Sequence, residues 1–343
     1  MRSAPRIAFI THGGPAIGLG HVCRCLALGR AFAADGADVR FLVNPEARVA
    51  ALVRRASVAA VEVPWEADPG VVFAPLTAFS PDVVVVDSYR ASAEFLAALH
   101  SVVGQVVAVD DLADRPLPVH IVVNGGVAAE TLAYGHVTDA VLLLGPRYAL
   151  VDPRFAAAPG RSPRDRVQRV FVSLGGGHHP DALATAAAAV EAVGDGIVAD
   201  IALGPFASGS SELDAPTRRV QNRVFVHRDL SDLRRLMLAA DVAISAAGMT
   251  LYELAATATP TVVVCMADNQ IPNADGFERA GAALRGGSTG DSGLGLALEA
   301  SLRRLVADRA LRATLGGRAR DLVDGRGASR GAREIASLIF TRR

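Results

Sequence analysis

The fold is decided near the start of the chain by Ile7-Ala-Phe-Ile10, the loop Thr11-His-Gly-Gly-Pro-Ala16 and the stretch Ile17-Gly-Leu-Gly-His-Val-Cys-Arg-Cys-Leu-Ala-Leu28. The first of these predicts a short buried strand, and the last predicts a glycine-rich turn that opens a helix over 21–35. Gly18 and Gly20 let the backbone turn tightly and approach a ligand closely. A strand, a glycine-rich turn and a helix are typical of α/β domains, in which ligands bind at the carboxyl ends of parallel strands.

His21 and Arg24 are three residues apart and share one face of the first helical turn. A cation in a first turn opposes the helix dipole. We therefore interpret Arg24 as a residue that faces an anionic ligand at the helix N-terminus. The alternative is a glycine-rich turn that carries a surface histidine and arginine without function.

Further strands are predicted in the first half of the chain at 38–43, 58–63, 82–87, 105–109 and 120–124, with helices over 45–55 and up to residue 99. The run Asp82-Val-Val-Val-Val-Asp87 is typical of a parallel strand that is buried on both faces. Gly13, His21, Asp87, Tyr89 and Asp110 follow strand ends and are expected at one edge of the sheet.

The same pattern restarts after the Pro-, Gly- and Arg-containing segment 156–166, which we predict to be a linker. Strands are expected at 170–174, 198–203, 224–227, 241–245 and 260–265, and helices up to about 193, over 230–239 and 251–256, up to 281, and over 293–315 and 326–341. The predicted domains are 1–155 and 167–325, with a last helix in 326–343 that packs back on the first domain. We expect two doubly wound Rossmann-like α/β domains with a cleft between them.

Three stretches of the second half have residues suited to a sugar nucleotide. Backbone N–H groups at Gly175 and Gly176 can hold a phosphate. In the turn Ala247-Gly248-Met249-Thr250, Thr250 can cap the following helix, and Glu253 either completes a capping box or accepts hydrogen bonds from the two ribose hydroxyls. Asn269 and Gln270 offer donors and acceptors for sugar hydroxyls.

Composition excludes several classes of protein. The formal net charge is 0, which argues against a nucleic-acid partner, and all 35 cationic side chains are arginine, which excludes a Schiff-base or Walker A lysine. Three cysteines without metal or disulfide spacing fit a reducing cytoplasm. No run approaches the about 20 apolar residues that span a bilayer, which leaves room for a peripheral membrane contact.

Several motifs together resemble one family. They are Ile-Gly-Leu-Gly-His-Val-x-Arg-Cys-Leu-Ala-Leu (17–28), Val-Val-Asp-Ser-Tyr (85–89), Val-Asp-Asp-Leu-Ala-x-Arg (109–115), Leu-Leu-Gly-Pro-Arg-Tyr-Ala-Leu (143–150), Val-Ser-Leu-Gly-Gly (172–176), Ala-Ala-Gly-Met-Thr-x-x-Glu (246–253) and Ala-Asp-Asn-Gln (267–270). This set, spread over about residues 7–285, resembles the UDP-sugar hydrolases of pseudaminic acid biosynthesis. Those enzymes have the GT-B fold and are similar to the N-acetylglucosaminyltransferase that makes lipid II and to spore-coat polysaccharide proteins.

The resemblance implies hydrolysis of UDP-2,4-diacetamido-2,4,6-trideoxy-β-L-altropyranose by water attack at C1, with inversion, release of UDP and no metal or other cofactor. His21 aligns with the family histidine that activates water. The sugar side would consist of Gly18, Gly20, Arg24, Asp87, Tyr89, Asn269 and Gln270. The UDP side would consist of Gly175, Gly176, Ala247, Gly248, Met249, Thr250 and Glu253.

The first loop departs from the family pattern. The family has Arg-x-Asp before Ile-Gly-x-Gly-His, whereas this chain has Thr11-His-Gly-Gly-Pro15, so the sugar and the choice between hydrolase and glycosyltransferase stay open. A transferase needs room for an acceptor, and we expect Arg48, Arg54, Arg55 and Trp65 to form a weak basic and apolar patch for it. A non-catalytic UDP-sugar-binding protein is the third alternative. We expect a monomer, and the sequence does not decide whether Asp87 or Asp110 assists His21.

Overall fold

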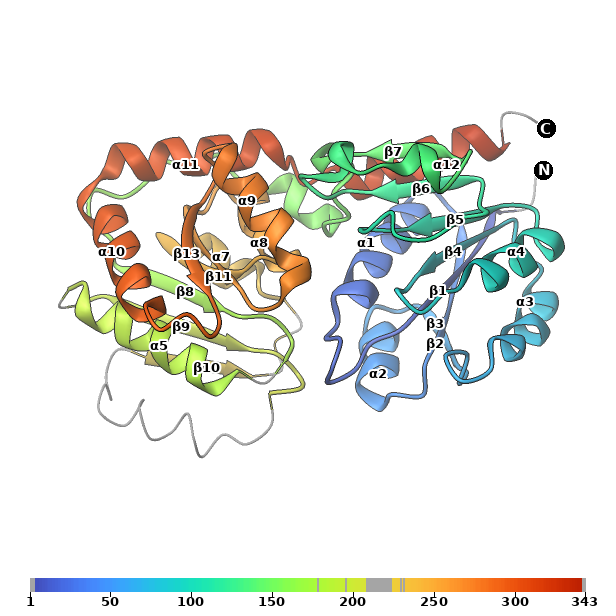
Figure 1. The fold of residues 1–343 in the computed structure, drawn as a ribbon, viewed down its shortest axis with the longest axis horizontal. Helices are drawn as coiled ribbons and strands as arrows, with labels where there is room; N and C mark the ends of the chain where they lie inside the picture. Colours follow the sequence, from blue (N-terminus) through green and yellow to red (C-terminus); the bar gives the residue numbers. More distant parts are fainter. Residues whose placement is uncertain are drawn as a thin grey trace. The chain divides into compact units, whose positions relative to one another are not determined.

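The computed structural model describes residues 4–177, 179–194, 196–207, 224–228, 230 and 232–340. The chain divides into two compact units, of which the first is Met1–Pro153 with Gly325–Arg343 and the second is Arg154–Asp324 (Figure 1). Each unit is built on its own parallel β-sheet covered by helices.

The sheet of unit 1 has the strand order β3-β2-β1-β4-β5-β6-β7 in the described part of the chain, and its neighbouring strands are parallel. Its strands are β1 (Arg6–Thr11), β2 (Asp38–Val43), β3 (Ala59–Glu62), β4 (Val83–Asp87), β5 (Val106–Val109), β6 (Ile121–Asn124) and β7 (Val141–Leu144). Thr11 is in register with Asp87, and Asp87 with Val109. The loops after β1, β4 and β5 therefore leave the sheet side by side.

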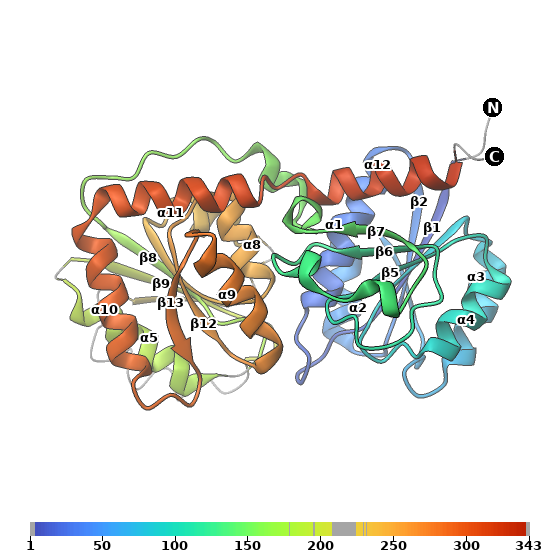
Figure 2. The same cartoon turned by 45° about the horizontal axis from the view of Figure 1, so that its top comes forward.

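Both faces of this sheet are buried because alternate residues of each strand belong to different hydrophobic cores. Ile7 and Phe9 pack with α1 (Gly20–Ala34), α2 (Ala47–Arg55) and α12 (Gly327–Phe340). Ala8 and Ile10 pack with α3 (Phe73–Phe79) and α4 (Ala93–Val102). The last helix of the chain, α12, contacts α1 (Figure 2).

The described sheet of unit 2 has the order β10-β9-β8-β11-β12-β13, again with parallel neighbours. Its strands are β8 (Arg169–Ser173), β9 (Val198–Leu203), β10 (Val224–Arg228), β11 (Val242–Ala246), β12 (Thr261–Cys265) and β13 (Leu284–Ser288). Its helices are α5 (Pro180–Ala192), α7 (Arg234–Ala239), α8 (Met249–Ala256), α9 (Ile271–Arg279), α10 (Leu294–Ala307) and α11 (Arg309–Leu322).

Several elements differ from the sequence-based expectation, among them strand β7, which was not predicted. The predicted helix over 293–315 is two helices, because Asp308 ends α10 and caps α11 by accepting the N–H of Leu311 at 2.8 Å. Helix α3 was not predicted, since it is short and contains a proline. Strand β13 was not predicted because Leu-Arg-Gly-Gly-Ser has no apolar run, and it lies at the edge of its sheet.

The segment that we predicted to be a linker, 156–166, lies on unit 2 and is held there by arginines. Arg161 donates to Met237 O and Thr259 Oγ1, and Arg164 pairs with Asp241. Arg312 is 1% exposed and donates to the carbonyls of Arg164 and Asp165, and also to those of Leu305 and Val306. Several of these carbonyls belong to the last turns of helices α7 and α10, where a cation is favoured by the helix dipole.

None of the described helices combines the length and the apolar character that crossing a membrane requires.

Candidate functional site

His21 lies in the first turn of α1 and is held by the carboxylate at the end of β4. Its Nδ1 atom is 2.7 Å from Asp87 Oδ1, and the histidine is 6% exposed. With the proton on Nδ1, this contact is a hydrogen bond donated to Asp87, and the lone pair is on Nε2. Within the described part of the chain no hydrogen bond uses Nε2. The ring is therefore oriented by the protein and keeps one nitrogen for a ligand or a water molecule.

Asp87 is fully buried between two cationic or potentially cationic side chains. Arg24 donates to it through Nε at 2.6 Å and through Nη2 at 2.7 Å. Burial alone would raise the pKa of the Asp87 carboxyl, but the charge and hydrogen bonds of Arg24, followed by those of His21, hold that pKa well below its usual range. Asp87 is therefore an ionised acceptor for His21 across the working pH range.

Arg24 has a different partner from the one that we expected. Its Nη1 donates to both carboxylate oxygens of Asp111 at 2.8 Å, and its Nε and Nη2 donate to Asp87, with Nη2 also 3.1 Å from His21 Nδ1. In this structure two carboxylates, rather than an anionic ligand, explain a cation in the first turn of α1. Two carboxylates against one guanidinium leave this cluster with one formal negative charge when His21 is neutral.

Tyr89 covers the exposed side of this cluster. Its ring lies 4.6 Å from the His21 ring, edge-on, and its hydroxyl donates to Asp111 at 2.7 Å. Burial and the Asp111 charge raise the pKa of the Tyr89 hydroxyl, so it stays a donor. Gly18, with φ +72°, and Gly20, the first residue of α1, lie in the turn that carries His21. Tyr89 is 36% exposed and can contact a ligand.

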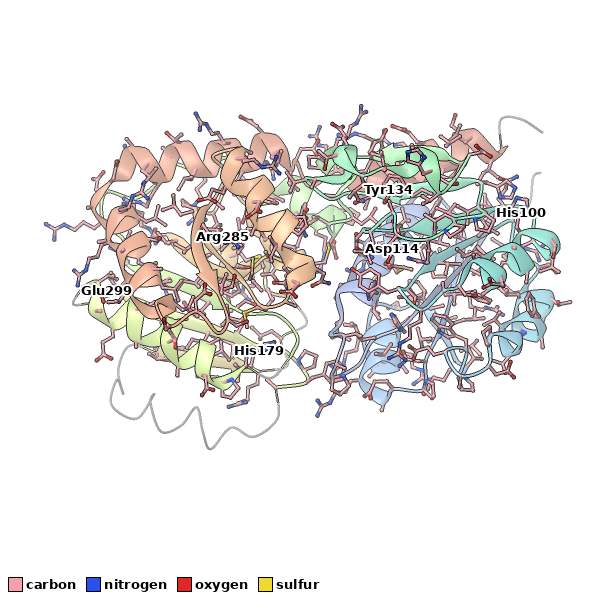
Figure 3. All side chains as sticks on the ribbon, in the orientation of Figure 1. His100, Asp114, Tyr134, His179, Arg285 and Glu299 are labelled. Carbon is pink, nitrogen blue, oxygen red and sulfur yellow. The ribbon has the colours of Figure 1, made fainter. Side chains whose placement is uncertain are left out.

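The sequence left open whether Asp87 or Asp110 assists His21, and the contacts of Asp110 answer that question. Asp110 accepts the backbone N–H groups of Leu112 and Ala113 and the hydroxyl of Tyr134, which is labelled in Figure 3. Asp87 is thus the carboxylate that contacts His21. Asp111, which sequence reasoning missed, joins the cluster through Arg24.

Trp65 does not belong to a surface patch, contrary to our expectation. It is 1% exposed, and its Nε1 donates to the carbonyl of Thr11 at 3.2 Å. Its ring stacks on that of Phe95 within the core of unit 1. Arg54, from the same predicted patch, pairs with Glu62. An apolar contact for an acceptor at Trp65 is therefore ruled out in this structure.

The glycine-rich loop of unit 2 follows β8. Gly175 has φ +92°, which favours glycine, and Gly176 is in close backbone contact with Gly204. A Cβ added to Gly204 would lie 2.4 Å from the Cα of Gly176. The loop therefore requires glycine at Gly175 for its conformation and at Gly204, against which Gly176 packs.

Helix α8 starts at Met249 with Gly248 as its N-cap, and no side chain caps it. Thr250 is already inside the first turn, so the predicted capping box of Thr250 with Glu253 is not formed. The N–H of Leu251 donates to Gly248 O at 3.1 Å, and the glycine N-cap offers no side chain to the N–H groups before Leu251, which suit water or a ligand. Ala247 is buried at the end of the preceding strand.

Asn269 and Gln270 lie in the short 3₁₀ helix η7 (Asp268–Gln270) that follows β12. Asn269 is exposed, whereas the side-chain oxygen of Gln270 accepts the N–H of Met266 at 3.0 Å. Asn273, which the sequence did not single out, donates to Ala247 O and accepts from Tyr252 Oη. Asn273 thus joins the loop before α8 to α9.

No group of three or more His, Cys, Asp or Glu side chains within the described ranges is arranged to hold a metal ion.

The fold is that of the GT-B glycosyltransferases: two parallel-sheet α/β domains in one chain. MurG from Acinetobacter baumannii is similar over 96% of this chain and 99% of its own, with a TM-score of 0.67 at 16% identity. The spinosyn rhamnosyltransferase SpnG, solved with thymidine diphosphate, gives the same coverage, TM-score and identity. The calicheamicin glycosyltransferase CalG4 is similar over 99% of both chains, with a TM-score of 0.64 at 17% identity. This confirms the predicted fold class.

No family model matches the sequence. The spore coat polysaccharide biosynthesis protein SpsG of Bacillus subtilis (strain 168) is 30% identical over 194 residues, which are 54% of this chain and 55% of SpsG. The chain thus spans about half the length of the curated relative that it matches.

Proposed function

We propose that this chain is an enzyme that hydrolyses a UDP-linked amino sugar and that His21 is its general base. The observation that carries the proposal is the His21–Asp87 pair, in which Nδ1 is fixed at 2.7 Å from a buried carboxylate and Nε2 has no hydrogen bond within the described residues. The cluster of Arg24, Asp87 and Asp111 has one formal negative charge, so a proton on His21 makes it neutral. Such a surrounding stabilises the imidazolium that a general base becomes.

In the proposed reaction, Nε2 of His21 accepts a proton from water while the water oxygen forms a bond to C1 of the sugar. The C1–O bond to the β-phosphate breaks, and its electron pair leaves with UDP. Because water attacks opposite the leaving group, the configuration at C1 inverts. The proton on His21 then returns to solvent, which regenerates the neutral base.

Unit 2 is proposed to bind the nucleotide. The N–H groups of the Gly175–Gly176 loop and of the uncapped first turn of α8 suit the diphosphate, which gains negative charge as the bond breaks. Glu253 follows in α8 and is proposed to accept the ribose hydroxyls. SpnG, with the same fold, was solved with a nucleoside diphosphate. Uridine as the base is part of the proposal and comes from the motif resemblance.

The sugar is proposed to be UDP-2,4-diacetamido-2,4,6-trideoxy-β-L-altropyranose or a relative. Tyr89 would contact the sugar, and Asn269 and the amide NH₂ of Gln270 would donate to its polar groups. Similarity to SpsG supports a role in making a surface polysaccharide. His12 stands in the loop where the resembling family has Arg-x-Asp, and a relative of the named sugar is therefore as good a candidate as that sugar itself.

The second candidate function is an inverting glycosyltransferase with the same donor, in which an acceptor hydroxyl replaces water at His21. Its support is that the full-length structural neighbours SpnG and CalG4 are transferases.

The test is UDP release from a panel of UDP-amino sugars without acceptor, with calorimetric binding of UDP and thymidine diphosphate beside it. We expect the wild type to release UDP and His21→Gln to lose turnover at least about 10³-fold with UDP affinity unchanged. His100→Gln, at an exposed histidine of the same unit, is the matched control. Tight UDP binding without release would favour the transferase, and loss of UDP binding in His21→Gln would contradict the assignment of His21.

A further inference from the structure

A second carboxylate–histidine pair lies beside the first. His12 follows β1 and is 1% exposed, and its Nδ1 is 2.5 Å from Glu66 Oε1. Its ring centroid is 5.1 Å from that of His21. Two buried imidazoles at this separation cannot both be charged without a strong repulsion. The surroundings of the two histidines therefore determine which of them is protonated.

The two histidines differ in their hydrogen bonds. His12 uses both nitrogens, since Nδ1 contacts Glu66 and Nε2 contacts Ser88 Oγ at 3.1 Å. In the neutral state Nδ1–H donates to Glu66, and the Ser88 hydroxyl donates to Nε2. Protonation of Nε2 would force the second bond to reverse, with Nε2–H donating to the Ser88 oxygen that already accepts the N–H of Arg90. His21, in contrast, has Nε2 available.

The two pairs also differ in charge. Arg90 Nη1 lies 3.0 Å from the same Glu66 oxygen that contacts His12, so that one cation already balances one carboxylate. The cluster around His21 has two carboxylates and one guanidinium and is balanced only when His21 is charged. The charged groups that act on His12 are Glu66, His21 and Asp87, and burial, as the largest effect, lowers the pKa of His12.

We propose that the Arg90–Glu66 ion pair keeps His12 neutral and thereby directs the proton of the reaction to His21. His12 and Arg90 are positioning residues here, because they act through His21 and not on the substrate. The proposal rests on the proposed function for its kinetic consequence, but the distribution of protons between the two histidines can be measured without any substrate.

The perturbation is Arg90→Gln, which leaves Glu66 without its cation and makes His12 a competitor for the proton. Arg90 has a 60% exposed side chain, so the change should not disturb folding. We expect kcat/KM on the acid limb of the pH profile to fall about 2–10-fold, which corresponds to a shift of that limb to higher pH by about 0.3–1 unit. Arg54→Gln, which breaks the exposed Arg54–Glu62 pair of the same unit, is the control without a shift.

The double variant Glu66→Gln/Arg90→Gln separates charge from structure. It removes both charges, while the Gln oxygen can still accept from His12 Nδ1, so the acid limb should return to its wild-type position. The proposal is wrong if the acid limb shifts as much in the double variant as in Arg90→Gln. It is also wrong if the acid limb shifts in neither variant.

NMR of ¹⁵N-labelled histidine side chains gives the readout that needs no activity. In the wild type we expect His12 to stay neutral as the pH falls, and in Arg90→Gln we expect His12 to titrate at higher pH. If His12 is protonated first in the wild type, or if its titration is the same in Arg90→Gln, the proposal is wrong whether or not the chain is a hydrolase. Absence of UDP release with the expected titrations would contradict the proposed function alone.

Discussion

Replacing Asp87 with asparagine perturbs the most buried charge of the site. Asp87 is 0% exposed and accepts from His21 Nδ1, Arg24 Nε and Arg24 Nη2 at 2.6–2.7 Å. The amide keeps the volume but removes the charge, so Asp111 alone remains to balance Arg24. Removing one partner of a buried ion pair costs about 3–5 kcal/mol. In a domain of this size that lowers Tm by roughly 6–20 °C.

Activity should fall for a separate reason. An Asn amide that donates to His21 Nδ1 favours the tautomer with its proton on Nε2, which cannot accept a proton from water. We expect kcat to drop about 10³–10⁴-fold, the effect of losing a carboxylate that orients a catalytic histidine. UDP affinity should not change, since the nucleotide is proposed to bind unit 2.

Calorimetric unfolding and UDP release measure the two effects on one preparation. Asp111→Asn is the matched control, because that side chain is 30% exposed and contacts Arg24 but not His21. It should cost less than about 2 kcal/mol and change kcat far less. If Asp87→Asn keeps kcat within tenfold of the wild type, Asp87 does not set the state of His21 and the reasoning is wrong.

Three further changes test other parts of the structure. Gly204→Ala places a Cβ 2.4 Å from Gly176 Cα and should weaken UDP binding about tenfold or more in a calorimetric titration, whereas Gly317→Ala, in open space on α11, should not. Burial lowers the pKa of His12 below 6.5, so at lower pH the unfolded chain binds a proton that the folded chain does not. The free energy of unfolding should therefore fall as the pH drops below about 6.5, by at most about 1.4 kcal/mol per pH unit. Thermal melts of His12→Gln should show a weaker pH dependence. Arg312→Met leaves four backbone carbonyls without their buried donor and should lower the free energy of unfolding by about 2–4 kcal/mol in denaturant titrations. An unchanged denaturation midpoint would show that Arg312 does not hold segment 156–166 in place.

The fold was predictable because its strands carry their own signal. Runs such as Val83–Asp87 are buried on both faces and read as parallel strands without any tertiary information. A strand at the edge of a sheet need not have such an apolar run. Strand β13 has two glycines and a single apolar residue, and it is defined by pairing with β12.

The site was predictable only as far as strand ends determine it. Asp87 and His21 follow from position, since both fall at the carboxyl edge of the sheet. The choice between Asp87 and Asp110 stayed open because Asp110 turns back to the backbone, and that is a local conformation the sequence does not reveal. The His12–Glu66 pair joins residues 54 positions apart. The adjacent Trp65 is buried and donates to the Thr11 carbonyl, which places the Glu66 loop beside the end of β1.

His21 is proposed to activate water at the anomeric carbon of a UDP-linked sugar. This role can be tested most directly by turnover of that sugar nucleotide in water enriched in ¹⁸O, with mass spectrometry of both products and NMR of the first-formed anomer. We expect one ¹⁸O atom on C1 of a free sugar of inverted configuration, unlabelled UDP, and no product with His21→Gln. Label in the UDP, which means attack at phosphorus, or undiminished turnover by His21→Gln would contradict it.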